Sequence, residues 1–216
     1  DLAASPSWRL ATPEDVRQPA VGRAVAEWYR ALHGAGRRWL AAQPAPPAWL
    51  AREADALTPE RLRWMGARLD MPGDPLWDLA AGHIASLQAA ARSLPETLTY
   101  NDFFWANLAL SRPRDDAARQ ALRAVVFDLH LLGIGLRHSD CRNVTSSLGP
   151  AAASAFRQAY GPTDRREALL DAALAPLYSL WIALQRPTLL AWAEEDVRRL
   201  GTGALERALR AALAAL

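Results

Sequence analysis

The stretch Leu98–Leu110 reads LTYNDFFWANLAL, and the interpretation of the remaining sequence depends on it. One short apolar run enters this stretch and another leaves it, a pattern typical of two short strands joined by a loop. The loop carries an acid, Asp102, and an amide, Asn107. A further acid, Asp128, directly follows the apolar run Ala124–Phe127. We therefore expect Asp102, Asn107 and Asp128 to form one site on a small β-hairpin.

Helical signals occupy most of the remaining sequence. A capping residue followed by proline marks helix starts at Thr12-Pro13, Thr58-Pro59 and Asp74-Pro75. Together with apolar residues at helical spacing, these signals predict helices over residues 13–33, 59–69, 75–91, 140–147, 150–160, 165–184, 187–200 and 203–216. The sequence thus predicts a mainly α fold, with a single helical domain over residues 1–216 and one small β element.

Composition narrows the classes of function. The chain has 216 residues and a net charge of +2, and every basic residue except histidine is arginine. Acids nearly balance the arginines and no run of five like charges occurs, so nucleic-acid binding is not expected. The sequence shows neither an uncharged apolar run of membrane length nor a basic-then-apolar leader, and we expect a cytoplasmic protein without a membrane span. A single cysteine, Cys141, excludes a disulfide framework and a cysteine-rich zinc site.

The three polar residues have a chemistry in common. A carboxylate close to a hydroxyl can accept its proton while the hydroxyl acts as a nucleophile. An amide oxygen and a second carboxylate are hard ligands that suit Mg²⁺ when phosphates supply the remaining oxygens. These are the components of phosphoryl transfer, in which catalysis consists mostly of positioning and charge neutralisation. The spacing D-x4-N alone also occurs by chance, so the residues around it decide whether it marks a functional site.

That context resembles a known family. Tyr100–Leu108, YNDFFWANL, resembles the H-x-D-x4-N catalytic loop of the kinase-like fold, and most of all that of the aminoglycoside-phosphotransferase family, which includes choline kinase-like and other small-molecule kinases. Val125–Asp128 is similar to the strand that delivers the family's metal-binding aspartate. Leu32-His33 and Asp140 also resemble family positions, a helix end and a buried acid at a helix start. The resemblance implies the helical C-terminal lobe of a kinase-like fold, with the hairpin carrying both loops.

The resemblance also implies roles for the site residues. Asp102 would be the catalytic base, and Asn107 and Asp128 would hold Mg²⁺ that bridges the phosphates of ATP or GTP. Asp140 would cap a helix and brace the catalytic loop. The implied reaction transfers the γ-phosphate to a hydroxyl of an aminoglycoside-like or amino-alcohol acceptor. As alternatives, Asp102 and Asn107 would be turn residues that close a hairpin, and Asp128 an ordinary cap.

Two departures from the family pattern are visible. Tyr100 stands where the family usually has histidine, a position where we expect an aromatic ring to support the loop by packing. The 216 residues contain no lysine and no G-x-G-x-x-G, the two features with which the N-terminal β lobe of such kinases grips the nucleotide. We therefore expect that this lobe is absent and that the chain alone lacks appreciable kinase activity.

A non-catalytic interpretation stays open beside the enzymatic one. The chain would then be a kinase-like helical module that binds a small molecule or a protein, and the surface where an N-terminal lobe docks would be a partner or homodimer interface.

The acceptor is suggested by aromatic residues near the C-terminus. Trp181 and Trp192, with the acids Glu194–Asp196, would suit a cationic acceptor. The alternative for these acids is a solvated helix face. Trp105 would either line an acceptor pocket or seal the catalytic loop.

Overall fold

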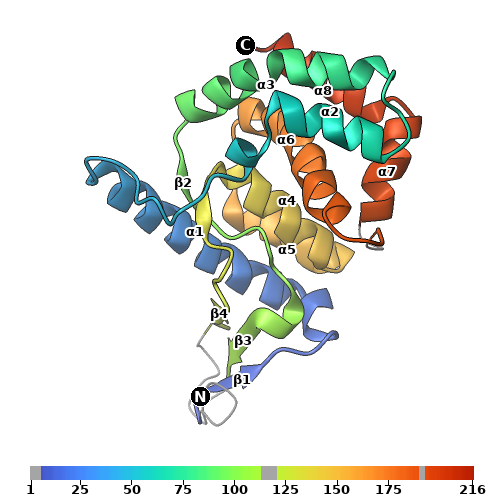
Figure 1. The fold of residues 1–216 in the computed structure, drawn as a ribbon. Coiled ribbons are helices and arrows are strands. Elements are labelled where there is room, and N and C mark those ends of the chain that lie inside the picture. The colour runs from blue at the N-terminus through green and yellow to red at the C-terminus, as the bar shows by residue number, and fades with distance from the viewer. Residues whose placement is uncertain (1–5, 113–120, 190–192) are drawn as a thin grey trace. The chain divides into compact units, whose positions relative to one another are not determined.

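A computed structural model describes residues 6–112, 121–189 and 193–216, and these are mainly helical, as predicted (Figure 1). The α-helices are α1 (Pro19–Ala41), α2 (Pro59–Arg68), α3 (Pro75–Ser93), α4 (Arg137–Ser147), α5 (Pro150–Tyr160), α6 (Arg165–Leu184), α7 (Glu194–Gly201) and α8 (Ala204–Leu213). Short 3₁₀ helices are η1 (Asp15–Arg17), η2 (Glu53–Ala56) and η3 (Trp105–Asn107). The strands are β1 (Trp8–Leu10), β2 (Thr97–Thr99), β3 (Leu108–Ser111), β4 (Ala124–Val126) and β5 (Gly133–Gly135).

The chain forms two compact units. Unit 1 comprises Asp1–Leu50, Thr97–Gly133 and Arg137–Thr163, and unit 2 comprises Ala51–Glu96, Ile134–Leu136 and Asp164–Leu216. All three predicted site residues belong to unit 1. The single C-terminal lobe expected from the resemblance stays a prediction.

A hairpin is present in unit 1, but it joins β3 to β4, whereas β2, the apolar run that enters the Asp102 loop, lies in a different sheet from β3. Strand β3 pairs antiparallel with β4 in a register that places Leu108 opposite Val126. Strand β1, which the sequence did not predict, adds to the other edge of β3 and places Trp8 opposite Ser111. The sheet order is therefore β1-β3-β4. The turn expected at residues 111–116 lies largely outside the described residues.

Helix α1 differs from its prediction at both ends. It begins at Pro19 instead of Pro13, because the carboxylate of Asp15 accepts hydrogen bonds from Arg9 and from the Thr12 N–H and closes the turn η1 first. Proline at the first helical position then starts the helix. At the other end it continues through Gly36 to Ala41, since Gly36 lies on the buried side of the helix and serves close packing there.

Aromatic rings fill the core of unit 1. Tyr29 of α1 is fully buried, and its ring meets Phe103 edge-on at 6.3 Å and Phe156 of α5 edge-on at 6.4 Å between centroids. Tyr100 and Phe103, from the predicted catalytic loop, are themselves core residues. The loop is thus anchored by its own aromatic side chains.

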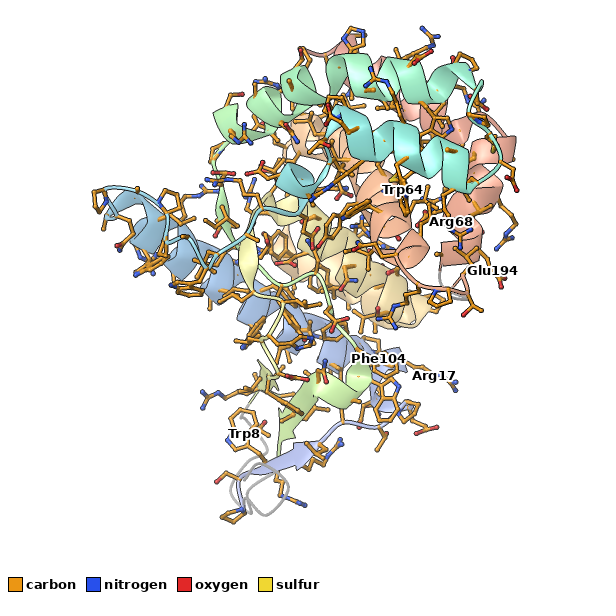
Figure 2. The ribbon with its side chains drawn as sticks, viewed as in Figure 1. Trp8, Arg17, Trp64, Arg68, Phe104 and Glu194 are labelled. Atoms are coloured by element: carbon orange, nitrogen blue, oxygen red, sulfur yellow. The ribbon has the colours of Figure 1, made fainter. Side chains whose placement is uncertain are left out.

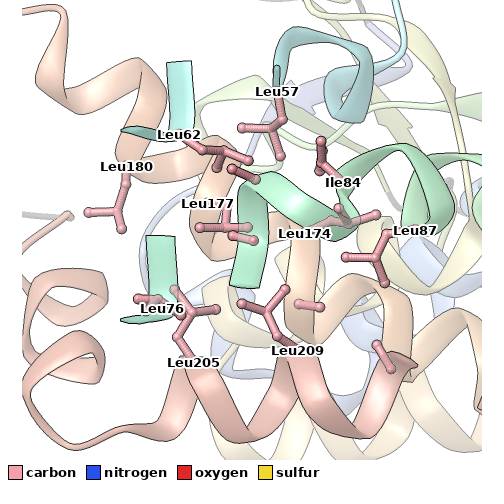
Figure 3. Packing of buried hydrophobic residues seen from close by; sticks show 14 of the residues in the cluster. Leu57, Leu62, Leu76, Ile84, Leu87, Leu174, Leu177, Leu180, Leu205 and Leu209 are labelled. Carbon is pink, nitrogen blue, oxygen red and sulfur yellow. The ribbon is translucent and has the colours of Figure 1, made fainter. Parts of the chain in front are cut away.

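Leucines fill the core of unit 2, which is built from α2, α3, α6 and α8 (Figure 3). The caps predicted for α2 and α3 are present: the Thr58 hydroxyl accepts from the Arg61 N–H at 3.2 Å, and Asp74 accepts from the Leu76 N–H at 2.9 Å. Within the described residues, α6 alone is long and apolar enough to cross a membrane. This is weak evidence for a membrane span, because 56% of its most apolar 18-residue segment is buried inside the structure. The buried Leu177 marks α6 as a core helix of this unit.

Candidate active site

The hydroxyl of Tyr100 joins the two predicted metal ligands. It donates a hydrogen bond to the main-chain carbonyl of Asp128 at 3.0 Å. It also accepts one from the side-chain Nδ2 of Asn107 at 3.1 Å. The histidine position of the family motif is therefore filled by a residue that makes directed polar contacts, beyond the packing role expected from its ring.

The hairpin brings Asn107 and Asp128 to the same end of the sheet. Because Leu108 pairs with Val126, Asn107 lies opposite Phe127, whose N–H donates to the Asn107 carbonyl at 3.0 Å. Asp102 lies in the same loop, half-buried. Burial is the main reason that the pKa of Tyr100 is raised, and the charges of Asp102 and Asp128 add to it. The structure thus joins two of the predicted residues, Asn107 and Asp128, through one phenol, and Asp102 lies in the same loop.

Asp128 has a left-handed backbone, with a φ of 62°. This conformation is uncommon outside glycine, and aspartate tolerates it better than most residues do. Its carboxylate is 58% exposed and lies 3.2 Å from Nδ1 of His130. Through a hydrogen bond to the Asp128 carbonyl, and through the charge of Asp128, the pKa of His130 is raised. The turn therefore presents an accessible carboxylate.

Helix α4 holds the backbone of the loop on both sides of Asp102. The Tyr100 N–H donates to both carboxylate oxygens of Asp140, at 2.8 and 3.0 Å, which is the bracing role expected for this acid. The expected cap role is wrong, because α4 begins at Arg137 and Asp140 lies inside its first turn. The Phe103 N–H donates to the Asn143 side chain at 2.7 Å. Residues three apart on a helix share a face, so both anchors come from one side of α4. Asn143 was missed at the sequence level, and its spacing from Asp140 in a predicted first turn was the available signal.

A buried polar network lies beneath this anchor. Asp140 is fully buried and its carboxylate is 2.8 Å from Nε2 of His33 in α1. The other ring nitrogen of His33 is 2.7 Å from the Tyr160 hydroxyl of α5. Burial raises the pKa of Asp140, and the contact with His33 acts in the opposite direction. The network joins three helices under the predicted catalytic loop.

The chemistry of the donors fits Mg²⁺. The Asp128 carboxylate and the Asn107 amide oxygen are hard oxygen ligands, which this ion prefers. Among the described residues, His, Cys, Asp and Glu side chains form no group of three or more that could hold a metal. A site with one carboxylate and one amide relies on substrate phosphates for its other ligands, as in kinases.

The proposed acceptor aromatics are placed in part. The ring of Trp181 carries the guanidinium of Arg61 at 4.6 Å and meets Trp64 edge-on at 5.4 Å, so this face already has a cation. On α7, Glu195 pairs with Arg198 at 2.6 Å, which fits the alternative of an ion-paired, solvated helix face. Trp192 lies outside the described residues.

Trp105 and Phe104 are neighbours in the predicted catalytic loop, but their rings differ in exposure. Trp105 packs against the core of unit 1, which favours the sealing role over the pocket role. Phe104, labelled in Figure 2, has an exposed side chain. Its exposed fraction is 52%, and its ring centroid lies 5.3 Å from that of Trp105.

Comparisons with known proteins bear on the fold. The sequence matches no family model and no curated protein. Among solved structures, the chain is similar to a choline/ethanolamine kinase family protein from Mesorhizobium loti, with a TM-score of 0.56 and 17% sequence identity. The match covers 96% of this chain and 71% of that chain. The chain therefore has the fold of a choline kinase-like protein, which confirms the resemblance at the level of the fold.

Proposed function

We propose that this chain supplies the catalytic and metal-binding loops of a small-molecule O-phosphotransferase. The reaction transfers the γ-phosphate of ATP or GTP to a hydroxyl of a small acceptor. The observation that carries the proposal is that the Tyr100 hydroxyl joins Asn107 and Asp128 at one end of the hairpin, on the loop that also holds Asp102. The choline kinase-like fold supports it.

Each residue has a stated task. Asp102 orients the acceptor hydroxyl and takes its proton as the oxygen attacks phosphorus. Hydrogen bonds to Asp140 and Asn143 hold the loop backbone on both sides of Asp102. The conformational entropy lost when Asp102 takes its position beside the acceptor hydroxyl is therefore small. Asn107 and Asp128 would hold Mg²⁺, which neutralises phosphate charge when it is bound.

The acceptor class follows from weaker indications. The structural neighbour is a choline/ethanolamine kinase family protein, which favours an amino alcohol. An aminoglycoside-like acceptor is the second choice, based on the motif. The cation already on the Trp181 ring argues against that ring as the site for an acceptor's positive charge.

The test is phosphate transfer in the complete natural protein that contains these 216 residues. Radiolabelled γ-phosphate is followed from ATP or GTP to choline, ethanolamine and an aminoglycoside panel, with Mg²⁺ present. Asp102→Asn is expected to lower kcat about 10²- to 10⁴-fold, the usual worth of a general base. Its effect on nucleotide affinity is expected to be small, because Asp102 acts on the acceptor.

A matched control uses Asp70, an exposed aspartate that also has a left-handed backbone, with a φ of 56°. Asp70→Asn is expected to leave transfer unchanged, whereas Asp128→Asn is expected to raise the Mg²⁺ concentration required. Absence of transfer to every acceptor with both nucleotides would contradict the proposal, as would full activity of Asp102→Asn.

A further inference from the structure

We propose that Tyr100 is a positioning residue whose hydroxyl sets the amide orientation of Asn107, so that Oδ1 of Asn107 is presented as a ligand beside Asp128. The orientation is argued from hydrogen bonding alone. Its use in holding a metal rests on the proposed function.

The direction of the bonds follows from a count of protons. A phenol has one O–H, and a main-chain carbonyl can only accept. Since Tyr100 Oη lies 3.0 Å from the Asp128 carbonyl oxygen, its proton is used there. Towards Asn107, at 3.1 Å, the same oxygen can then only accept. The NH₂ of the Asn107 amide must therefore face Tyr100, and its oxygen must face away.

The geometry around Tyr100 is held from several sides. Its side chain is buried, and its N–H is bound by Asp140 at 2.8 and 3.0 Å. Its carbonyl accepts from the hydroxyl of Tyr29 at 3.2 Å. A phenol ordinarily has a pKa of about 10, so Tyr100 keeps its proton at neutral pH. The donor-acceptor direction is therefore permanent under working conditions.

Orientation matters because the two ends of an amide are not equivalent. The oxygen of Asn107 can bind a hard cation, whereas its NH₂ group has no available lone pair and would repel one. The same hydroxyl bonds the carbonyl of Asp128, a residue in the strained left-handed region. One side chain thus stabilises both parts of the proposed metal site.

The chain offers a simple spectroscopic test, because Asn101, Asn107 and Asn143 are its only asparagines. With ¹⁵N-labelled asparagine, the side-chain signals of Asn107 are those that vanish in Asn107→Asp. The comparison is between wild type, Tyr100→Phe and the control Tyr178→Phe, which removes a hydroxyl from α6 in unit 2.

In wild type we expect the Asn107 NH₂ protons to show a nuclear Overhauser effect to the Tyr100 ring. We expect their exchange with water to be about tenfold slower than in Tyr100→Phe, as for a hydrogen bond of about 1.4 kcal/mol. Tyr178→Phe should leave these signals unchanged. Binding of the Mn²⁺ complex of ATP to the complete natural protein, followed by electron paramagnetic resonance, should weaken about tenfold in Tyr100→Phe and stay the same in Tyr178→Phe, because the phosphates supply the remaining ligands.

The outcomes separate the proposed role of Tyr100 from the proposed metal site. Absence of the Overhauser effect in wild type overturns the role of Tyr100 without any need for a folded variant, and so do Asn107 signals that do not respond to Tyr100→Phe. A response of these signals together with weaker Mn²⁺ binding supports both proposals. A response in a protein whose wild type does not bind the Mn²⁺ complex of ATP supports the orientation by Tyr100 and counts against the proposed metal site.

Discussion

Asp15 illustrates, at the scale of the residue, how one carboxylate joins a strand to a helix. It is 4% exposed and accepts from both terminal nitrogens of Arg9, at 2.6 and 2.7 Å, and from the Thr12 N–H at 2.8 Å. The hydrogen bonds from Arg9 are the largest reason that the pKa of Asp15 falls to about 2. The residue thereby ties β1, the edge strand of the hairpin sheet, to the turn before α1.

This pKa predicts how stability depends on pH. A carboxyl whose pKa is lower in the folded state stabilises fully above its ordinary pKa of about 3.8, and that contribution is lost as pH falls through about 2. At pH 7, Asp15→Asn is expected to lower the free energy of unfolding by on the order of 1–2 kcal/mol, a figure reduced for solvent screening of the half-exposed Arg9.

Urea unfolding at pH 7 and at several values between 4 and 2 measures this effect. The gap between wild type and Asp15→Asn should shrink across the acid range, while the exposed control Asp70→Asn stays close to wild type throughout. A gap that does not change with pH would rule out the ion pair as its cause.

At the scale of the element, the approach of β2 to α1 depends on a glycine. A Cβ on Gly36 would lie 2.6 Å from the backbone nitrogen of Leu98 and 2.8 Å from the hydroxyl of Thr97. That hydroxyl donates to the His33 carbonyl at 2.7 Å, so strand and helix are also hydrogen-bonded. Since the predicted catalytic loop begins where β2 ends, this contact sets its starting point.

Two alanine substitutions on one helix test this contact. Gly36→Ala is expected to destabilise by about 1–3 kcal/mol, because backbone atoms must move to admit the methyl group. Gly34→Ala is the control, since its Cβ would meet only the end of the Arg38 side chain at 3.6 Å. It should stabilise by about 0.5–1 kcal/mol through helix propensity. Urea unfolding of both variants should show opposite signs, and equal signs would contradict this account.

At the scale of the whole molecule, residues far apart in sequence form the support of the site. His33, Asp140 and Tyr160 come from α1, α4 and α5 and meet in one buried network. Removing one partner of a buried acid lowers the free energy of unfolding, because the charge that remains on the acid is neither solvated nor paired. The network therefore couples the packing of three helices to the position of the Tyr100 backbone, which Asp140 also binds.

A double-mutant cycle measures that coupling. His33→Ala is expected to cost about 3–5 kcal/mol, the usual cost of breaking a buried pair. In the Asp140→Asn background the same change should cost at least 1 kcal/mol less, because no charge remains to be stranded. Tyr160→Phe, which removes only the outer hydroxyl, should cost about 1 kcal/mol. Additive effects of the first two substitutions would show that His33 and Asp140 act independently.

Local signals predicted most of the helices. The bounds of α5 and α6 agree with the sequence reading, and the caps Thr58 and Asp74 do what their positions indicated. Helix bounds and caps depend on a few residues that are neighbours in the chain, which is why they can be predicted from the sequence. The start of α1 was wrong because Asp15 found its partner, Arg9, in a strand that has no recognisable pattern of its own.

The candidate site also has a part that the sequence predicted and a part that it did not. By itself, the sequence determined a mainly α chain with a hairpin, and the motif that contains Asp102, Asn107 and Asp128. Only the tertiary structure decided that Tyr100 joins the last two, and that Asn143 holds the loop. The reason is physical. A hydrogen bond requires a donor–acceptor distance within a few tenths of an ångström and a suitable angle. Groups as far apart in sequence as the Phe103 N–H and the Asn143 side chain reach that geometry only when the elements that carry them pack.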